Sequence, residues 1–183
     1  MKEILFGACF MMFVTTTCLA QNYITRNGNI SIYSHTQAED IKAQNNEVVS
    51  VVNASTGSVE LKLAIKSFHF AKTAMEEHFN DDDYMASEKY PKAGFKGKIT
   101  NITAVDFTKN GTYNVSVTGD LTIRDVTKTI TIPGVITVAD GSITITSTFN
   151  VKRKEYNVIG ESFVQEKIGE EIQITVNCKC AKQ

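Results

Sequence analysis

The sequence lacks a concentrated run of charge of one sign. Its formal net charge is −1, and its densest basic run is only Lys152-Arg153-Lys154. Duplex nucleic acid is bound by concentrated basic surfaces. The composition therefore argues against nucleic acid as a partner, and we interpret residues 152–154 as part of a solvated loop.

The sequence also lacks the short motifs of common catalytic sites. It contains no Gly-x-Ser-x-Gly elbow, no Gly-rich phosphate loop and no Cys-x-x-Cys pair. The acidic run Asp81-Asp82-Asp83 lacks the spacing of a calcium-binding loop, so we expect a solvated loop there. We expect neither an enzyme nor a cofactor.

Histidine is scarce. The three histidines are His35, His69 and His78, and none stands in a His-x-x-x-His or similar metal-binding spacing. Strands that are distant in sequence could still bring three histidines together around a zinc ion. We interpret all three as ordinary polar side chains. A metal-binding or hydrolytic barrel built on them is the alternative.

Only one hydrophobic run stands out, and it is too short to span a bilayer, which takes ~20 residues. Residues 4–14 are apolar, Lys2 precedes them, and Cys18-Leu19-Ala20 follows. This is the pattern of a secretory signal peptide over residues 1–20, with cleavage after Ala20. We expect residues 21–183 to form one periplasmic or secreted domain. A buried N-terminal element and a lipoprotein anchor at Cys18 are the alternatives.

Two cysteines remain in the expected mature chain, Cys178 and Cys180. In a strand, this spacing puts both side chains on one face. Their Cα atoms would then lie ~6.5–7 Å apart, at the outer limit for a disulfide. We interpret them as small core-facing residues, and oxidation in an oxidising compartment stays open.

Alternation of apolar and polar residues dominates the rest of the chain. It runs through residues 59–66, 113–124, 143–151 and 172–177. Each run has one apolar and one wet face, which is typical of half-buried antiparallel strands. We predict strands, of which neighbours can merge, over residues 28–35, 38–44, 46–53, 57–68, 95–107, 111–124, 127–138, 142–152 and 170–180.

Turn signals separate these strands, and two segments break the rhythm. The turn signals are Asn27-Gly28, Thr56-Gly57, Asn110-Gly111, Pro133-Gly134 and Asp140-Gly141. Residues 75–79 predict a helical turn that ends at residues 80–83, and residues 155–169 are irregular. An all-β domain of many strands with one short helical insertion predicts a closed barrel or a sandwich.

A barrel of about eight strands has an interior that side chains fill or share with one small ligand. Binding an apolar molecule inside it requires no motif. Each buried methylene contributes ~0.8 kcal/mol before the costs of association. The sequence of a lipid carrier can therefore lack any recognisable binding motif. The sequence of a structural barrel with a filled core can lack one as well.

Several segments, in order along the chain, resemble the YceI-like family. Residues 78–79 (His-Phe) and 90–95 (Tyr-Pro-x-x-x-Phe) are similar to the family's His-Leu and Tyr-Pro-x-x-x-Phe segment. Residues 117–128 resemble its Gly-x-Leu-Thr-Ile-x-x-Val-Thr-Lys hallmark. Residues 153–158 (Arg-Lys-Glu-Tyr-Asn-Val) and 168–172 (Ile-Gly-Glu-Glu-Ile) are similar to its last two segments.

The resemblance implies an all-β, antiparallel, lipocalin-like barrel of about eight strands with a short helix closing one side. It also implies a tubular apolar pocket for a long isoprenoid-type lipid, such as a quinone or a polyprenyl phosphate. Met75-Glu76 stand where many members carry Arg-Asp. Because arginine is a natural partner of phosphate, this departure favours a neutral quinone or another hydrophobe.

The same pattern assigns candidate ligand-binding residues. Those expected along the apolar tube are Phe68, Phe70, Phe79, Phe95, Val117, Leu121, Ile123, Phe149 and Phe163. Those expected at its polar mouth are His78, Tyr84, Arg153 and Tyr156. A tyrosine joins an apolar ring to a polar tip, which suits the end of an amphiphile.

The expected function is carriage or storage of this lipid. The alternatives are the histidine-based barrel and a structural or stress-related envelope protein without a ligand. Members of the family are often paired, so a homodimer is possible in principle. No sequence feature marks an interface.

Overall fold

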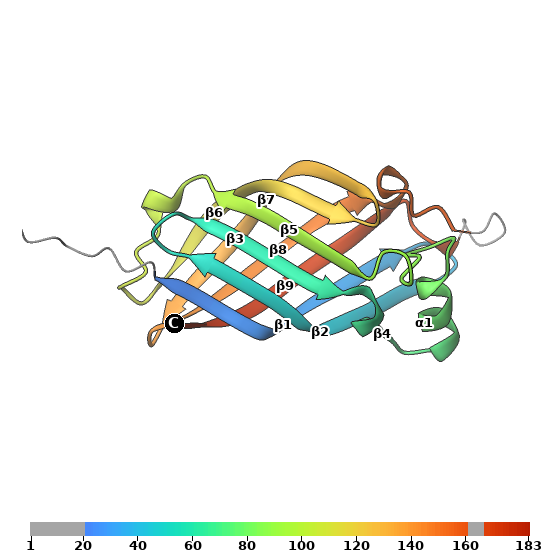
Figure 1. Cartoon of the computed structure of the whole chain (residues 1–183), viewed down its shortest axis with the longest axis horizontal. Helices are drawn as coiled ribbons and strands as arrows, with labels where there is room; N and C mark the ends of the chain where they lie inside the picture. The colour runs from blue at the N-terminus through green and yellow to red at the C-terminus, as the bar shows by residue number, and fades with distance from the viewer. Residues whose placement is uncertain (1–20, 161–166) are drawn as a thin grey trace, which may run out of the picture.

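The alternating segments form long strands that wrap into one closed wall (Figure 1). The computed structural model describes residues 21–160 and 167–183. The predicted signal peptide, residues 1–20, and the candidate Phe163 lie outside these residues. Along the chain the strands are β1 (Asn22–His35), β2 (Asp40–Asn53), β3 (Ser58–Ala64), β4 (His69–Phe70), β5 (Lys92–Ile99), β6 (Gly111–Ile123), β7 (Val126–Ala139), β8 (Ser142–Lys152) and β9 (Glu171–Lys182).

The strands pair in the order β1-β9-β8-β7-β6-β5-β3-β2, and β2 pairs with β1 to close the barrel. The pairings along this wall are antiparallel. The short β4 adds to β2 as an extra strand. The predicted fold, an antiparallel barrel of about eight strands, is therefore confirmed.

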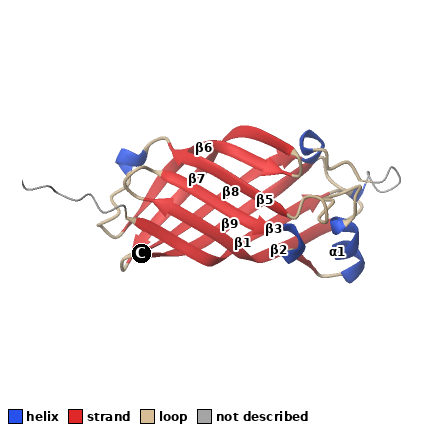
Figure 2. Ribbon diagram, viewed as in Figure 1, coloured by secondary structure: helices blue, strands red, loops and turns tan. Residues whose placement is uncertain are grey.

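The predicted helical insertion is confirmed as α1 (Thr73–Asn80), which lies at one end of the barrel (Figure 2). The one-turn helices η1 (Ile65–Ser67) and η3 (Arg153–Tyr156) lie near the same end, and η2 (Ile102–Ala104) lies at the other. None of the helices within the described part of the chain is long and apolar enough to cross a membrane.

Two of the predicted turns are wrong. Gly28 lies inside β1, at a shift in the pairing of β1 with β2. A Cβ atom there would lie 2.5 Å from the sulfur of Cys178, so the glycine serves close packing rather than a turn. Pro133-Gly134 lies inside β7. The predicted strands 38–44 and 46–53 merge into one strand, β2, as the prediction allowed.

Other strand ends also differ from the prediction. The predicted strand 57–68 ends at Ala64, where η1 follows, and the predicted strand 95–107 is β5, which ends at Ile99. The turn at Asp140-Gly141 is confirmed: both residues have positive φ, 49° and 74°. That geometry matches the right-handed twist of the flanking strands.

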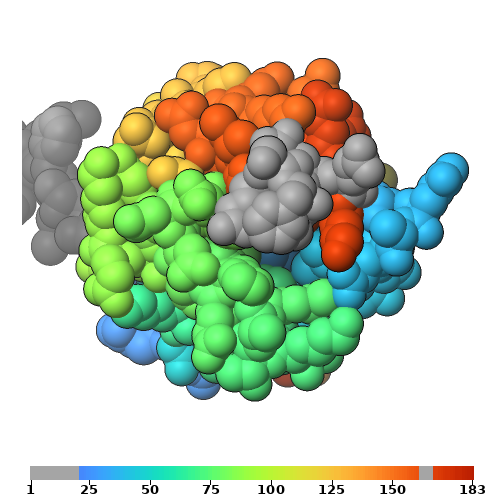
Figure 3. Space-filling model, turned by 90° about the vertical axis from the view of Figure 1, so that its right-hand side faces the viewer, coloured from blue at the N-terminus to red at the C-terminus, as the bar shows by residue number. Residues whose placement is uncertain are grey.

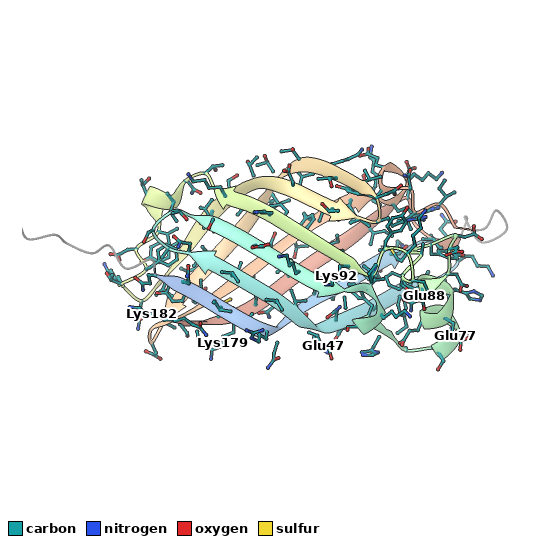
Figure 4. The ribbon with its side chains drawn as sticks, in the orientation of Figure 1. Glu47, Glu77, Glu88, Lys92, Lys179 and Lys182 are labelled. Carbon is teal, nitrogen blue, oxygen red and sulfur yellow. The ribbon has the colours of Figure 1, made fainter. Side chains whose placement is uncertain are left out.

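Side chains of opposite character lie on the two faces of the wall. Glu47, Lys92 and Lys179 point outward and are exposed (Figure 4).

The end of the barrel away from α1 is packed with buried side chains, and the ring of Tyr23 stacks on Phe107 with centroids 5.7 Å apart. Cys178 and Cys180 are both fully buried at this end and are free thiols. The barrel is thus closed at one end by its own core.

Candidate functional site

A cavity of about 400 Å³ lies inside the barrel, between the packed end and the end that carries α1. Its wall is built mainly of aliphatic and aromatic side chains from the inward faces of the strands. The volume falls within the ~300–1,000 Å³ that is typical of small-molecule sites. The inside of the barrel therefore has room for an apolar ligand.

Every candidate ligand-binding residue that the structure describes lines this cavity. Along the wall these are Phe68, Phe70, Phe79, Phe95, Val117, Leu121, Ile123 and Phe149. Toward the α1 end they are His78, Tyr84, Arg153 and Tyr156. The structure thus brings these residues together around one space, and their contact with a ligand stays a prediction.

A pair of glycines lets β5 and β6 approach closely beside the cavity. Gly97 on β5 and Gly119 on β6 face each other across the ladder, between the pairs Phe95–Leu121 and Ile99–Val117. A Cβ atom on Gly119 would lie 2.3 Å from the Cα of Gly97. A Cβ atom on Gly97 would lie 2.7 Å from the ring of Phe95, so this ring occupies the space that the glycines leave.

Three phenylalanines connect the wall to α1. The rings of Phe68 and Phe79 meet edge to face with centroids 5.5 Å apart, and the rings of Phe70 and Phe79 lie 5.0 Å apart. Such aromatic pairs are favourable beyond the apolar area that they bury. α1 has no buried residue. These contacts therefore hold it over the end of the barrel, which Figure 3 views end-on.

The α1 end of the cavity carries a buried guanidinium. Arg153 is 5% exposed and donates from Nε to the carbonyl oxygen of Gly169 (3.1 Å) and from Nη1 to that of Val158 (3.0 Å) and that of Ile159. Burial lowers the pKa of Arg153. Arg153 therefore ties the segment after η3 to the start of β9.

Two tyrosines flank this arginine. Tyr156 is 2% exposed, and burial, with the charge of Glu155 second, raises its pKa. The backbone carbonyl of Tyr84 accepts a hydrogen bond of 2.6 Å from Nη1 of Arg124. Arg124 also donates to the carbonyl of Asn157 (2.7 Å). A small number of polar groups thus gathers at one end of an otherwise apolar tube.

The three histidines do not form a site. His35, His69 and His78 have side chains 69%, 68% and 65% exposed, and each lies beside a carboxylate of its own. Within residues 21–160 and 167–183, no three His, Cys, Asp or Glu side chains form a group that could hold a metal ion. The geometry therefore does not favour the histidine-based alternative.

Sequence reasoning missed several residues of the cavity. Met75, Met85 and Ile65 line it near α1, and Ile172 and Ile174 line it from β9. Met75 stands four residues before Phe79 in α1, a spacing that puts both on one helix face. That spacing could have found Met75. For Met85, in an irregular loop, no local pattern was available.

The chain matches the model of a known family. A model of the YceI-like domain matches residues 22–180. The chain belongs to the YceI-like family. A search of curated proteins found no match.

Solved structures show the same YceI-like barrel. Burkholderia cenocepacia BcnA superposes with a TM-score of 0.70 at 22% identity, over 84% of this chain and 96% of that one. A polyisoprenoid-binding domain from Saccharophagus degradans, implicated in plant cell wall breakdown, gives 0.76 at 11% identity, over 90% and 99%. The Campylobacter jejuni YceI protein gives 0.63 at 17%, over 81% and 88%. At these identities the likeness shows the fold.

Proposed function

We propose that this chain binds a long isoprenoid-type lipid in the barrel and carries or stores it. The observation that carries the proposal is the cavity of about 400 Å³, which is apolar along the barrel and has its polar groups at the α1 end. An apolar chain fits the tube, and a polar head group fits beside Arg153, Tyr84 and Tyr156. A solved domain of the same fold that is named as polyisoprenoid-binding supports the ligand class.

The proposed ligand is a quinone or a polyprenyl phosphate, and the proposed location is the periplasm or the exterior. The hydrophobic run at residues 4–14, followed by small residues at 18–20, supports export. Each methylene that moves from water into the tube contributes ~0.8 kcal/mol, so ten carbons offer ~8 kcal/mol before association costs. Burial of the chain alone can therefore supply most of the affinity.

Organic extraction and mass spectrometry of residues 21–183, purified from a bacterial periplasm, test the proposal. We expect one isoprenoid per protein, and its mass identifies the head group. Protein that is empty, and that also fails to take up added quinone and polyprenyl phosphate, would contradict the proposal and favour a structural barrel.

A further inference from the structure

The barrel wall is incomplete between β7 and β8. Their ladder runs only from Val135–Thr146 to Ala139–Ser142. Toward the α1 end, β7 continues to pair with β6 and β8 continues to pair with β9, but β7 and β8 do not pair with each other. We call this break the β7–β8 seam, formed by residues 130–134 of β7 and 147–151 of β8.

A proline stands where the ladder stops. If the register of Val135–Thr146 continued, Gly134 would oppose Ser147, and Pro133 would oppose Thr148. Proline has no backbone N–H and cannot donate to a ladder, which is why it is confined to strand edges and bulges. Pro133 therefore makes this edge of β7 a poor partner for β8.

The cavity extends to the seam. Ile132, Pro133 and Gly134 line it from β7, and Ser147 and Phe149 line it from β8. Pro133 is exposed to solvent and lines the cavity as well. Ile132 and Phe149 are only partly buried, unlike the fully buried side chains at the packed end. At the seam, side chains rather than a hydrogen-bonded ladder separate the cavity from solvent.

Few contacts tie the two sides together. The hydroxyl of Ser147 donates to the carbonyl of Pro133 (2.6 Å) at an exposed position. Nearer to α1, Lys128 pairs with Glu155 (2.7 Å), and these two side chains are 39% and 47% exposed. Exposed ion pairs of this kind contribute little to stability. The seam can therefore open at a smaller cost than any fully laddered part of the wall.

The wall has a second place where neighbouring strands separate, between β2 and β3, and there the gap is filled. β2 and β3 pair only from Val49–Lys62 to Val52–Val59 and then separate. There, β4 pairs with β2 in place of β3, and the side-chain amide of Asn45 donates to the carbonyl of Ala64 (2.9 Å). The gap between β2 and β3 is therefore closed by a strand and a buried amide. The β7–β8 seam has neither of these.

End-on entry past α1 meets more obstruction. Phe68, Met85, Arg153 and Tyr156 line that end and are at most 8% exposed. An isoprenoid chain that entered there would displace these side chains and the hydrogen bonds of Arg153. A chain that entered sideways would pass Ile132 and Phe149 and could leave a lipid surface without being exposed to water along its length.

We propose that the β7–β8 seam is a lateral portal through which the isoprenoid chain enters and leaves the barrel. The inference rests on the proposed function, because it specifies the route to the same cavity. It predicts that the width of the seam controls the rate at which the cavity is loaded.

Locking the seam tests the proposal. The variant is Gly134→Cys/Ser147→Cys, and the matched control is Thr137→Cys/Thr144→Cys, whose residues are partners in the intact ladder. Menaquinone-4 in phosphatidylcholine vesicles is the probe. Its uptake is followed as quenching of tyrosine fluorescence, since the chain has six tyrosines and no tryptophan. We expect oxidation to slow uptake at least tenfold in the first variant, with recovery on reduction, and to leave the control unchanged.

A single substitution provides a test that does not depend on forming a disulfide. Ser147→Ala removes the hydrogen bond across the seam and is expected to speed uptake about fivefold, the equivalent of one ordinary neutral hydrogen bond. Uptake at the unlocked rate in the oxidised variant, or no acceleration in Ser147→Ala, overturns the portal. Equilibrium binding of the probe by the reduced proteins reports separately on the proposed function. Its absence in the wild-type protein contradicts that function.

Discussion

At the scale of single residues, the two cysteines of β9 illustrate how the packed end of the barrel is built. Cys178 and Cys180 stand on one face of β9, as their spacing predicts, and both are fully buried at the packed end. Burial, with the neighbouring Cys180 second, raises the pKa of Cys178 from an ordinary 9.0 to about 12. A thiol in this setting is a small apolar core residue and a poor nucleophile.

The raised pKa of Cys178 predicts a loss of stability in alkaline solution. The unfolded thiol ionises near pH 9 and the folded thiol near pH 12. The contribution is therefore fully present below about pH 9 and is lost as the pH rises toward 12. At about pH 10.5 the loss is on the order of 2 kcal/mol.

Urea unfolding at about pH 8 and at about pH 10.5 checks this. The control is Cys178→Ala, which is expected to be less stable at both pH values but to lose less between them. Because tyrosines and lysines titrate in both proteins, the difference between the two losses isolates the thiol. Equal losses of unfolding free energy in the two proteins would show that ionisation of Cys178 does not cause the alkaline loss of stability.

At the scale of the elements, β5 and β6 approach each other closely at the glycine pair 97 and 119. We predict that Gly119→Ala destabilises the fold by roughly 1–3 kcal/mol, since its Cβ would lie 2.3 Å from the Cα of Gly97 and 2.5 Å from the carbonyl of Lys96. Backbone atoms cannot move aside as a flexible side chain can.

The matched control is Gly134→Ala on β7. A Cβ atom there would meet nothing nearer than a methyl group of Val115 at 3.3 Å. Chemical denaturation of the three proteins compares the free energies of unfolding. If Gly119→Ala proved as stable as Gly134→Ala, the close approach of β5 and β6 would not be a constraint on the barrel.

The elements were predictable to different degrees. Strands such as β6 and β8 follow apolar–polar alternation that is interrupted at Gly119 and Ser147, so their positions could be inferred within a residue or two. The glycines at 28 and 134 misled the turn assignment. A glycine that accommodates a neighbouring strand and a glycine that makes a turn look alike in sequence, and only the neighbour, here Cys178 for Gly28, distinguishes them.

At the scale of the whole molecule, pairing of β1 with β2 closes the ring of strands, and the β7–β8 seam leaves parts of two strand edges unpaired. The interior is then divided between a packed end and a cavity. A ligand that occupies this cavity binds the folded state alone and stabilises it by mass action. With free ligand at about 100 times the dissociation constant, the gain is ~2.7 kcal/mol, or a rise in Tm of about 5–10 °C for a domain of this size.

Thermal unfolding with and without menaquinone-4 measures this gain. The control is Val117→Trp, which is expected to fill the middle of the cavity, keep the barrel and show no rise in Tm. Val117 lines the cavity and is 9% exposed. An equal rise in both proteins would place the ligand outside the barrel.

The sequence by itself determined the period of the strands, the position of the helical insertion and the identity of the inward-facing residues. All three depend on local pattern: alternation assigns each residue to a face whichever strand lies beside it. The family segments added the barrel architecture and the class of ligand to expect.

Only the tertiary structure decided which part of the interior is packed and which is hollow. Tyr23 closes one end by stacking on Phe107, which lies far from it in the chain. The separation of β7 from β8 at Pro133 depends likewise on how two neighbouring strands diverge in space. Such features arise from register and curvature between distant segments. Alternation predicts which face of the sheet a residue occupies, but it does not predict how far that residue lies from the neighbouring or facing strand.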